Sequence, residues 1–130
     1  MKPHKVAIID DDPAVLEAAA TLLTRGGLRV ATYHGRFDRL AFLLREQPDL
    51  LLLDVNMPAA SGEELHALLL EQPSLAHIPV VYFSSNDEHD LRALVRQSGA
   101  RGYLSKSRMG ADFAGQVARF LPPTPALALQ

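Results

Sequence analysis

Two patterns of hydrophobic and polar residues alternate along the chain. Short apolar runs bounded by polar or turn residues occur at residues 6–9, 50–53 and 80–83, and weaker ones at residues 28–33 and 102–105. Continuous apolar runs of this length are typical of strands that are buried on both faces. The pattern therefore predicts five strands of a parallel sheet.

Segments with helical spacing follow each of these runs. In residues 13–25 the apolar side chains recur every three or four positions, Asp12 can cap the helix and Pro13 suits its first position. Ser61 and Glu64 have the spacing of a capping box at the start of another helix. The remaining helices are predicted at residues 37–46, 61–69, 87–97 and 111–121.

Strands that alternate with helices predict an α/β fold, a doubly wound five-stranded parallel sheet of (βα)5 type with helices on both faces. The chain has 130 residues, of which 48% are hydrophobic, which is enough for one domain with one core. We expect this domain to span residues 1–121. Residues 122–130 are rich in proline and are predicted to form a frayed terminus or the stub of a linker.

Composition and charge exclude several classes of function. A net charge of −2 argues against a general nucleic-acid or anionic-membrane binder, and the absence of cysteine excludes disulfides, thiol nucleophiles and zinc thiolate sites. The first apolar run is too short for a signal peptide, and no stretch approaches the roughly 18 apolar residues of a membrane span. We expect a cytoplasmic protein.

Polar side chains follow four of the five predicted strands. They are Asp10 and Asp11 after the first, Asp54 after the third, Ser84 after the fourth and Lys106 after the fifth. The carboxyl ends of parallel strands meet at one edge of the sheet, where ligands bind, so we expect these groups to converge. Three close carboxylates need a counter-charge, and Mg²⁺ prefers oxygen ligands. With the lysine and the hydroxyl, such a site is equipped to transfer a phosphoryl group to a carboxylate.

These residues and their spacing resemble the response regulator receiver domains of two-component signalling. The resemblance covers about residues 4–121 and depends on the stretches IIDDDP, LLLLDVNMPAASG, PVVYFSS and GYLSK. It implies the flavodoxin-like strand order 2-1-3-4-5. It also implies that a histidine kinase or a histidine phosphotransfer protein supplies the phosphoryl group. An output partner would bind the face formed by the fourth helix, fifth strand and fifth helix, with no direct binding of nucleic acid or membrane.

The same resemblance implies a role for each site residue. Asp54 would be the phosphoacceptor, with Lys106 and Ser84 assisting the transfer. Mg²⁺ or Mn²⁺ would be held by Asp10, Asp11, Asp54 and the backbone carbonyl of Asn56, with Asp11 the more direct ligand of the acidic pair. Ser84 and Tyr103 would form the switch that responds to phosphorylation. Asp12 is not needed for the metal and is interpreted as a helix cap.

One residue departs from the family pattern. Ser107 follows Lys106 where the family usually has a proline, often after a cis bond. A cis bond before a residue other than proline costs about 3–4 kcal/mol. We therefore predict a trans Lys106–Ser107 bond, with the lysine still close to Asp54. Arg108 is expected to project from the start of the fifth helix into solvent.

Other functions remain open on the residues alone. A degenerate receiver could dock partners without phosphorylation. A phosphohydrolase with an aspartyl-phosphate intermediate would usually carry a second aspartate two residues after Asp54, where this chain has Asn56, so a turnover enzyme is disfavoured. A mononucleotide-binding fold is disfavoured because no glycine-rich loop follows the first strand.

Histidines and two arginines give weaker signals. The histidines have no metal-binding spacing and are expected at the surface; they are His4, His34, His66, His77 and His89. Arg92 and Arg96 are expected on a solvated face of the fourth helix, with contact to a partner as the minority interpretation.

Overall fold

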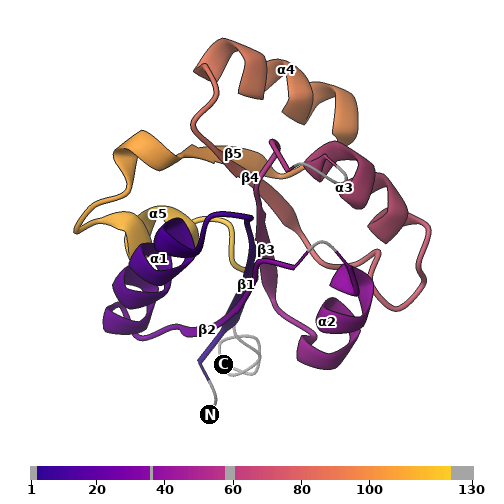
Figure 1. The fold of residues 1–130 in the computed structure, drawn as a ribbon. Coiled ribbons are helices and arrows are strands. Elements are labelled where there is room, and N and C mark those ends of the chain that lie inside the picture. Colours follow the sequence, from indigo (N-terminus) through magenta and orange to yellow (C-terminus); the bar gives the residue numbers. More distant parts are fainter. Residues whose placement is uncertain (1–2, 36, 58–60, 124–130) are drawn as a thin grey trace.

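Five strands and five α-helices alternate in the computed structural model, which describes residues 3–35, 37–57 and 61–123 (Figure 1). The strands are β1 (Lys5–Ile9), β2 (Arg29–Tyr33), β3 (Leu50–Leu53), β4 (Val80–Ser84) and β5 (Gly102–Ser105). The α-helices are α1 (Pro13–Arg25), α2 (Arg39–Glu46), α3 (Gly62–Leu70), α4 (Glu88–Ser98) and α5 (Phe113–Ala118), and a 3₁₀ helix, η1 (Lys106–Arg108), follows β5.

All neighbouring strands are parallel, in the order β2-β1-β3-β4-β5, as predicted. The register places Ile9, the last residue of β1, beside Tyr33 of β2 and Leu53 of β3. Backbone hydrogen bonds continue one residue further, because the amide of Asp54 donates to the carbonyl of Ile9 at 3.0 Å. The sheet therefore holds the segments that follow β1 and β3 side by side.

Alternate residues of the central strands face two separate cores. Val6 and Ile8 of β1 belong to the core beneath α1 and α5, whereas Ala7 and Ile9 belong to the core beneath α2, α3 and α4. Figure 1 shows the same arrangement, with α1 and α5 on one side of the sheet and the other three helices on the opposite side. Burial on both faces explains why these strands are continuously apolar.

The predicted helix caps are present. Asp12 accepts a hydrogen bond from the amide of Ala14 at 3.0 Å, and the Ser61 hydroxyl accepts one from the amide of Glu64 at 3.1 Å. These bonds satisfy amides that have no partner within the helix. They fix where the first helix starts after Asp11 and where the third starts after the loop beyond β3.

The fifth helix is shorter than the prediction of residues 111–121. The chain first forms η1, and α5 begins only at Phe113. At the other end the amides of Phe120 and Leu121 bond to carbonyls three residues back, and Pro122 follows. The last turn is therefore tighter than an α-helix, and the proline cannot continue it. The second helix likewise begins at Arg39 rather than at residue 37, because Asp38 adopts a left-handed conformation with φ 61°.

The prediction of surface histidines is wrong for His66. Its side chain is buried on α3, with Nδ1 3.1 Å from the Tyr82 hydroxyl of β4 and the two rings edge to face. A polar partner allows an imidazole to occupy an otherwise apolar core position. His34, His77 and His89 are exposed, and His4 is half-buried.

No helix in the described ranges is long and apolar enough to cross a membrane. The predicted tail, residues 122–130, lies outside the described residues except for its first two prolines.

Candidate functional site

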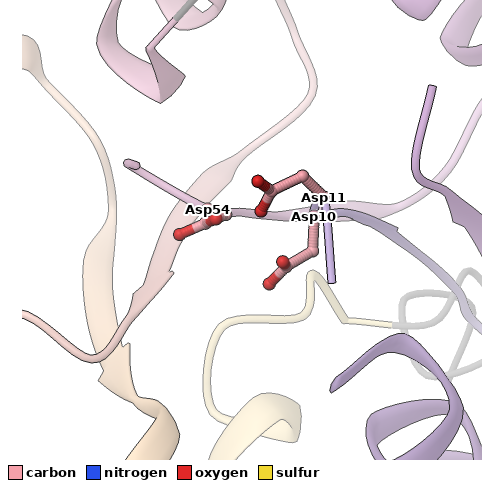
Figure 2. Close-up of side chains that lie close together, drawn as sticks. All are labelled: Asp10, Asp11 and Asp54. Atoms are coloured by element: carbon pink, nitrogen blue, oxygen red, sulfur yellow. The ribbon is translucent and has the colours of Figure 1, made fainter. Parts of the chain in front are cut away.

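Three carboxylates meet where β1 and β3 end (Figure 2). One oxygen each of Asp10, Asp11 and Asp54 lies within 4.8 Å of the other two. Asp10 and Asp54 are buried, at 0% and 3% exposure, whereas Asp11 is exposed. The sequence prediction that these acids converge is therefore confirmed.

Asp10 and Asp11 point in different directions from the end of β1, as Figure 2 shows. Asp10 Oδ1 accepts a hydrogen bond from the amide of Asp12 at 2.9 Å, whereas its buried Oδ2 has no hydrogen-bond partner in the described structure. The contact of Oδ2 is an ion pair, 2.7 Å from the ammonium of Lys106. Asp11 is thus the member of the pair that solvent and ligands reach directly.

Lys106 bridges two of the carboxylates. Its ammonium lies 2.7 Å from Asp10 Oδ2 and 3.4 Å from Asp54 Oδ1, and 5.7 Å from the centre of the Phe83 ring. The lysine therefore reaches Asp54 as predicted, and the Lys106–Ser107 bond is trans, because the described residues contain no cis peptide bond. The aromatic face of Phe83 is a favourable neighbour for an ammonium.

The Arg108 side chain is exposed, as predicted, but the element that carries it differs from the prediction. It lies in η1 rather than in the fifth helix, and its guanidinium forms an ion pair with Glu88 of α4 at 3.1 Å. Ser107 lies in the same turn, where its hydroxyl is 2.8 Å from that of Ser105. The serine therefore occupies the family's proline position within a turn that carries its own hydrogen bonds.

Burial and neighbouring charges together shift the pKa values of Asp54 and Lys106. Burial, with the added charge of Asp10, raises the pKa of Asp54 to about 6, although Lys106 opposes the shift. Burial by itself would lower the pKa of Lys106, but the carboxylates of Asp10 and Asp54 outweigh it and raise that pKa. One lysine does not neutralise three carboxylates, so the site has room for a further positive charge.

The donor atoms suit a hard divalent cation. Carboxylate oxygens are the ligands that Mg²⁺ prefers, and the cluster offers them from three side chains. Asn56 lies beside these carboxylates, because its backbone amide donates a hydrogen bond to Asp54 Oδ1 at 3.3 Å. The acidic pocket therefore fits Mg²⁺.

Ser84 ends β4 and Tyr103 lies in β5, and neither side chain contacts Asp54 in the described structure. The buried Ser84 hydroxyl accepts a hydrogen bond from the amide of Asn86 at 3.1 Å. The Tyr103 hydroxyl accepts one from Nε of Arg92 on α4 at 3.1 Å. Tyr103 is thus held toward α4, and the expectation that Arg92 is merely solvated is incomplete.

Sequence reasoning missed Gly62, the first residue of α3. A β-carbon at this position would lie 2.3 Å from the carbonyl oxygen of Asp54, and the Gly62 amide donates to the carbonyl of Val55 at 3.1 Å. The start of α3 therefore packs directly on the backbone of Asp54. The only indication in the sequence was a glycine beside a capping serine. The spacing of residues could not show that this glycine approaches the backbone of Asp54. The support that Phe83 gives to Lys106 was likewise invisible in the sequence.

Known proteins resemble this chain over most of its length. The model of the response regulator receiver domain matches residues 6–116. Protein PilG of Pseudomonas aeruginosa is 30% identical over 118 residues, which are 91% of this chain and 87% of PilG. Protein RcaC of Microchaete diplosiphon is 34% identical over 119 residues, which are 92% of this chain but only 18% of RcaC.

Solved structures of other proteins have a similar fold. The BeF3-activated N-terminal receiver domain of Klebsiella pneumoniae RstA has a TM-score of 0.80 at 27% identity, covering 92% of this chain and 99% of that one. The chemotaxis protein CheY4 of Vibrio cholerae, at 22% identity with a TM-score of 0.81 and the same coverage of both chains, supports the fold alone. Since the family model spans most of the chain and PilG matches it nearly from end to end, this protein belongs to the response regulator receiver domains of two-component systems.

Proposed function

We propose that this protein is a phosphoacceptor that receives a phosphoryl group on Asp54 from a histidine kinase or a histidine phosphotransfer protein in the cytoplasm. One observation carries the proposal. Asp54 is a buried carboxylate whose Oδ1 lies 3.4 Å from Lys106, inside a cluster of acids that suits a divalent cation. Receiver domains are signalling modules rather than turnover enzymes, and the phosphorylated state is the output.

The chemistry follows from the groups at the site. An oxygen of the Asp54 carboxylate attacks the phosphorus of the donor phosphohistidine, the P–N bond breaks, and the imidazole nitrogen keeps the electron pair. Lys106 supports the negative charge on the phosphoryl oxygens as they move. Mg²⁺ or Mn²⁺ held by Asp10, Asp11, Asp54 and the Asn56 carbonyl would supply further positive charge there.

The acyl phosphate would then change the surface. A phosphoryl group on Asp54 brings strong acceptor oxygens and negative charge to the edge of the sheet. Ser84 can donate its hydroxyl hydrogen to one of these oxygens, and Tyr103 would leave Arg92 and turn inward. The face formed by α4, β5 and α5 would change with Tyr103, so an output partner that prefers one arrangement shifts the population toward it.

A docking module that works without phosphorylation is the alternative. It would have no need of an ion-paired lysine in contact with a buried carboxylate. The contacts from Lys106 to Asp10 and Asp54 therefore favour the phosphoacceptor, even though Ser107 replaces the usual proline.

Acetyl phosphate with MgCl2 tests the proposal, read by intact mass. We expect one added phosphoryl group on the wild type, none on Asp54→Asn, and normal labelling of Asp90→Asn, which changes an exposed aspartate of α4. Labelling of Asp54→Asn at the wild-type level, or no labelling of the wild type, would contradict the phosphoacceptor role.

A further inference from the structure

Exposed apolar side chains gather over α2 and α3, which lie next to each other on one side of the sheet (Figure 1). All four large hydrophobic side chains that are exposed in the described part of the chain come from these helices or from the turn that leads into α2. They are Phe37 (77% exposed), Leu44 (47%), Leu68 (45%) and Leu70 (53%). Single exposed hydrophobic residues are common, but a cluster of them usually marks a binding surface.

An open groove of about 410 Å³ lies between the two helices. Five of the seven residues that line it are apolar: Phe37, Leu40, Ala41, Leu65 and Leu68. Leu44 continues this apolar surface, because it follows Leu40 by four positions and so lies on the same side of α2. We call the surface formed by Phe37, Leu40, Ala41, Leu44 and Leu68 the α2–α3 face.

The exposed ring of Phe37 belongs to a backbone that is tied to the core. The Tyr33 hydroxyl donates to the carbonyl of Phe37 at 2.5 Å, and the Tyr33 ring stacks on the buried Phe42 with a centroid distance of 5.0 Å. The amide of Phe42 in turn donates to the carbonyl of Asp38 at 2.9 Å. The α2–α3 face is therefore already formed before anything covers it.

The described chain ends close to one end of this face. Because the five strands are parallel, each connecting helix runs back to the edge where the strands begin. Pro122 and Pro123 line an open pocket of about 620 Å³ at that edge, together with Gln47, the residue that follows α2. Leu44 precedes Gln47 by three positions, which is about 4.5 Å along a helix.

Residues 124–130, TPALALQ, are suited to this face in length and charge. They contain no charged side chain, which matches a groove with a mostly apolar lining. Four extended residues span at most about 14 Å. Since Pro123 and Gln47 line one pocket, this length is enough to carry Leu127 to Leu44.

The spacing of the leucines also matches. In an extended segment Leu127 and Leu129 point to the same side, about 6.7 Å apart. On α2, Leu44 and Leu40 are about 6 Å apart along the helix axis. A segment that runs along α2 from its last turn toward its first therefore meets one leucine with another at each step.

We propose that residues 124–130 fold back onto the α2–α3 face as an intramolecular cover. Leu127 packs beside Leu44, and Leu129 packs beside Leu40. Removal of apolar surface from water drives this contact, and the short connection to Pro123 gives the segment an effective concentration of about millimolar. The inference goes beyond the proposed function and needs no phosphorylation.

A second copy of the chain is a poorer occupant of this face. A stable dimer usually buries about 800 Å² on each partner. The helix that carries most of the face, α2, has eight residues and is about 12 Å long. Such a surface suits a short segment that is already attached to the protein.

Disulfide trapping tests the inference, because the chain contains no cysteine of its own. Gln130→Cys is combined with Ala41→Cys on the α2–α3 face, and the intramolecular bond is read by intact mass at micromolar protein. The control pairs combine Gln130→Cys with Arg25→Cys or Gln97→Cys, which are exposed near the ends of α1 and α4. Both controls lie at the edge where the described chain ends, so an undocked segment would reach them at least as readily as Ala41.

Two further variants of the Ala41→Cys pair separate the leucines from the rest of the segment. Leu127→Ser/Leu129→Ser removes the proposed contacts. Ala126→Ser/Ala128→Ser is the matched control, because these alanines point to the other side of an extended segment. Circular dichroism checks that each variant is folded.

The inference is supported if the Ala41→Cys pair closes at least fivefold faster than both control pairs, and if the leucine variant loses this advantage while the alanine variant keeps it. Equal rates in the three pairs would overturn it, as would an advantage that survives the loss of both leucines. A mainly intermolecular disulfide whose yield rises with protein concentration would overturn it in favour of a second copy. Acetyl phosphate labelling of the same protein is read separately, so failure of this inference leaves the proposed function untouched.

Discussion

Lys106 makes its shorter ion pair with Asp10 rather than with Asp54: the ammonium is 2.7 Å from Asp10 Oδ2, against 3.4 Å from Asp54 Oδ1. In the resting site the lysine therefore neutralises the acid that is predicted to hold the metal. A cation bound to Asp10 would compete with this pair and free the lysine for Asp54.

Removing the Asp10 carboxylate tests whether a bound cation and Lys106 compete for it. In Asp10→Asn the lysine loses its nearer partner, and one of the three carboxylates proposed to bind the metal disappears. We expect Mg²⁺ affinity to fall at least tenfold, measured by isothermal titration calorimetry, because a hard cation depends on ligand charge. Glu17→Gln, an exposed acid of α1, should bind as the wild type does. Unchanged affinity in Asp10→Asn would show that Asp10 serves the lysine alone.

Asp54→Asn should stabilise the metal-free protein at neutral pH. The pKa of Asp54 is raised to about 6 by burial and by Asp10, so the folded state holds this proton more tightly than the unfolded chain does. Its contribution is favourable at low pH and is lost as pH rises through about 6. Urea unfolding in EDTA should therefore find the variant more stable by about 1–3 kcal/mol above pH 6, with the difference shrinking toward pH 4. Asp11→Asn should act in the same direction but less strongly, because Asp11 is exposed.

Added Mg²⁺ provides the control for that result. A cation that binds the folded wild type would raise its stability by mass action. The advantage of Asp54→Asn should then shrink or reverse. A variant that is less stable than the wild type in EDTA at pH 7.5 would mean that Asp54 is stabilised by Lys106 more than it is destabilised by burial and Asp10.

His66 should make the protein sensitive to acid. Burial lowers the pKa of His66, so its contribution to stability is present above the ordinary histidine pKa near 6.5 and is lost as pH falls below it. In an Asp54→Asn background, which removes the opposing titration, the free energy of unfolding should fall from pH 7.5 to pH 5. Adding His66→Phe should flatten that fall. Parallel pH profiles of the two proteins would refute the role of His66.

Gly62→Ala should disturb the site through the backbone of Asp54. Its β-carbon would meet the Asp54 carbonyl oxygen at 2.3 Å, so the start of α3 or the backbone of Asp54 must move. We expect a loss of about 1–3 kcal/mol in stability and slower phosphorylation by acetyl phosphate. Gly115→Ala is the matched control, because nothing lies within 4 Å of its new β-carbon and alanine favours the interior of α5 by about 0.5–1 kcal/mol. Equal stability of the two variants would contradict the close packing.

The sequence predicted most of the fold because its strongest signals were local or periodic. Residues 6–9 and 50–53 are continuously apolar since both faces of the sheet are covered, and Asp12 and Ser61 cap helices through nearby amides. Convergence of Asp10, Asp11 and Asp54 followed from parallel strand direction alone.

What could not be predicted depends on contacts between distant segments. His66 is buried because Tyr82, sixteen residues away, offers it a hydrogen bond. Lys106 follows β5 yet lies nearest to Asp10, which follows β1, and Tyr103 meets Arg92 because α4 packs beside β5. Helical spacing also could not locate the ends of α5, where tight turns at both ends shorten it.

Mapping the phosphorylated residue tests the central claim most directly. Borohydride reduces an aspartyl phosphate to homoserine, and peptide mass spectrometry then reads the position. After treatment with acetyl phosphate and Mg²⁺ we expect homoserine at position 54 alone, and none when EDTA replaces the metal. Homoserine at position 10 or 11, or equal conversion of Asp54 without a divalent cation, would contradict the assignment of Asp54 as a metal-dependent phosphoacceptor.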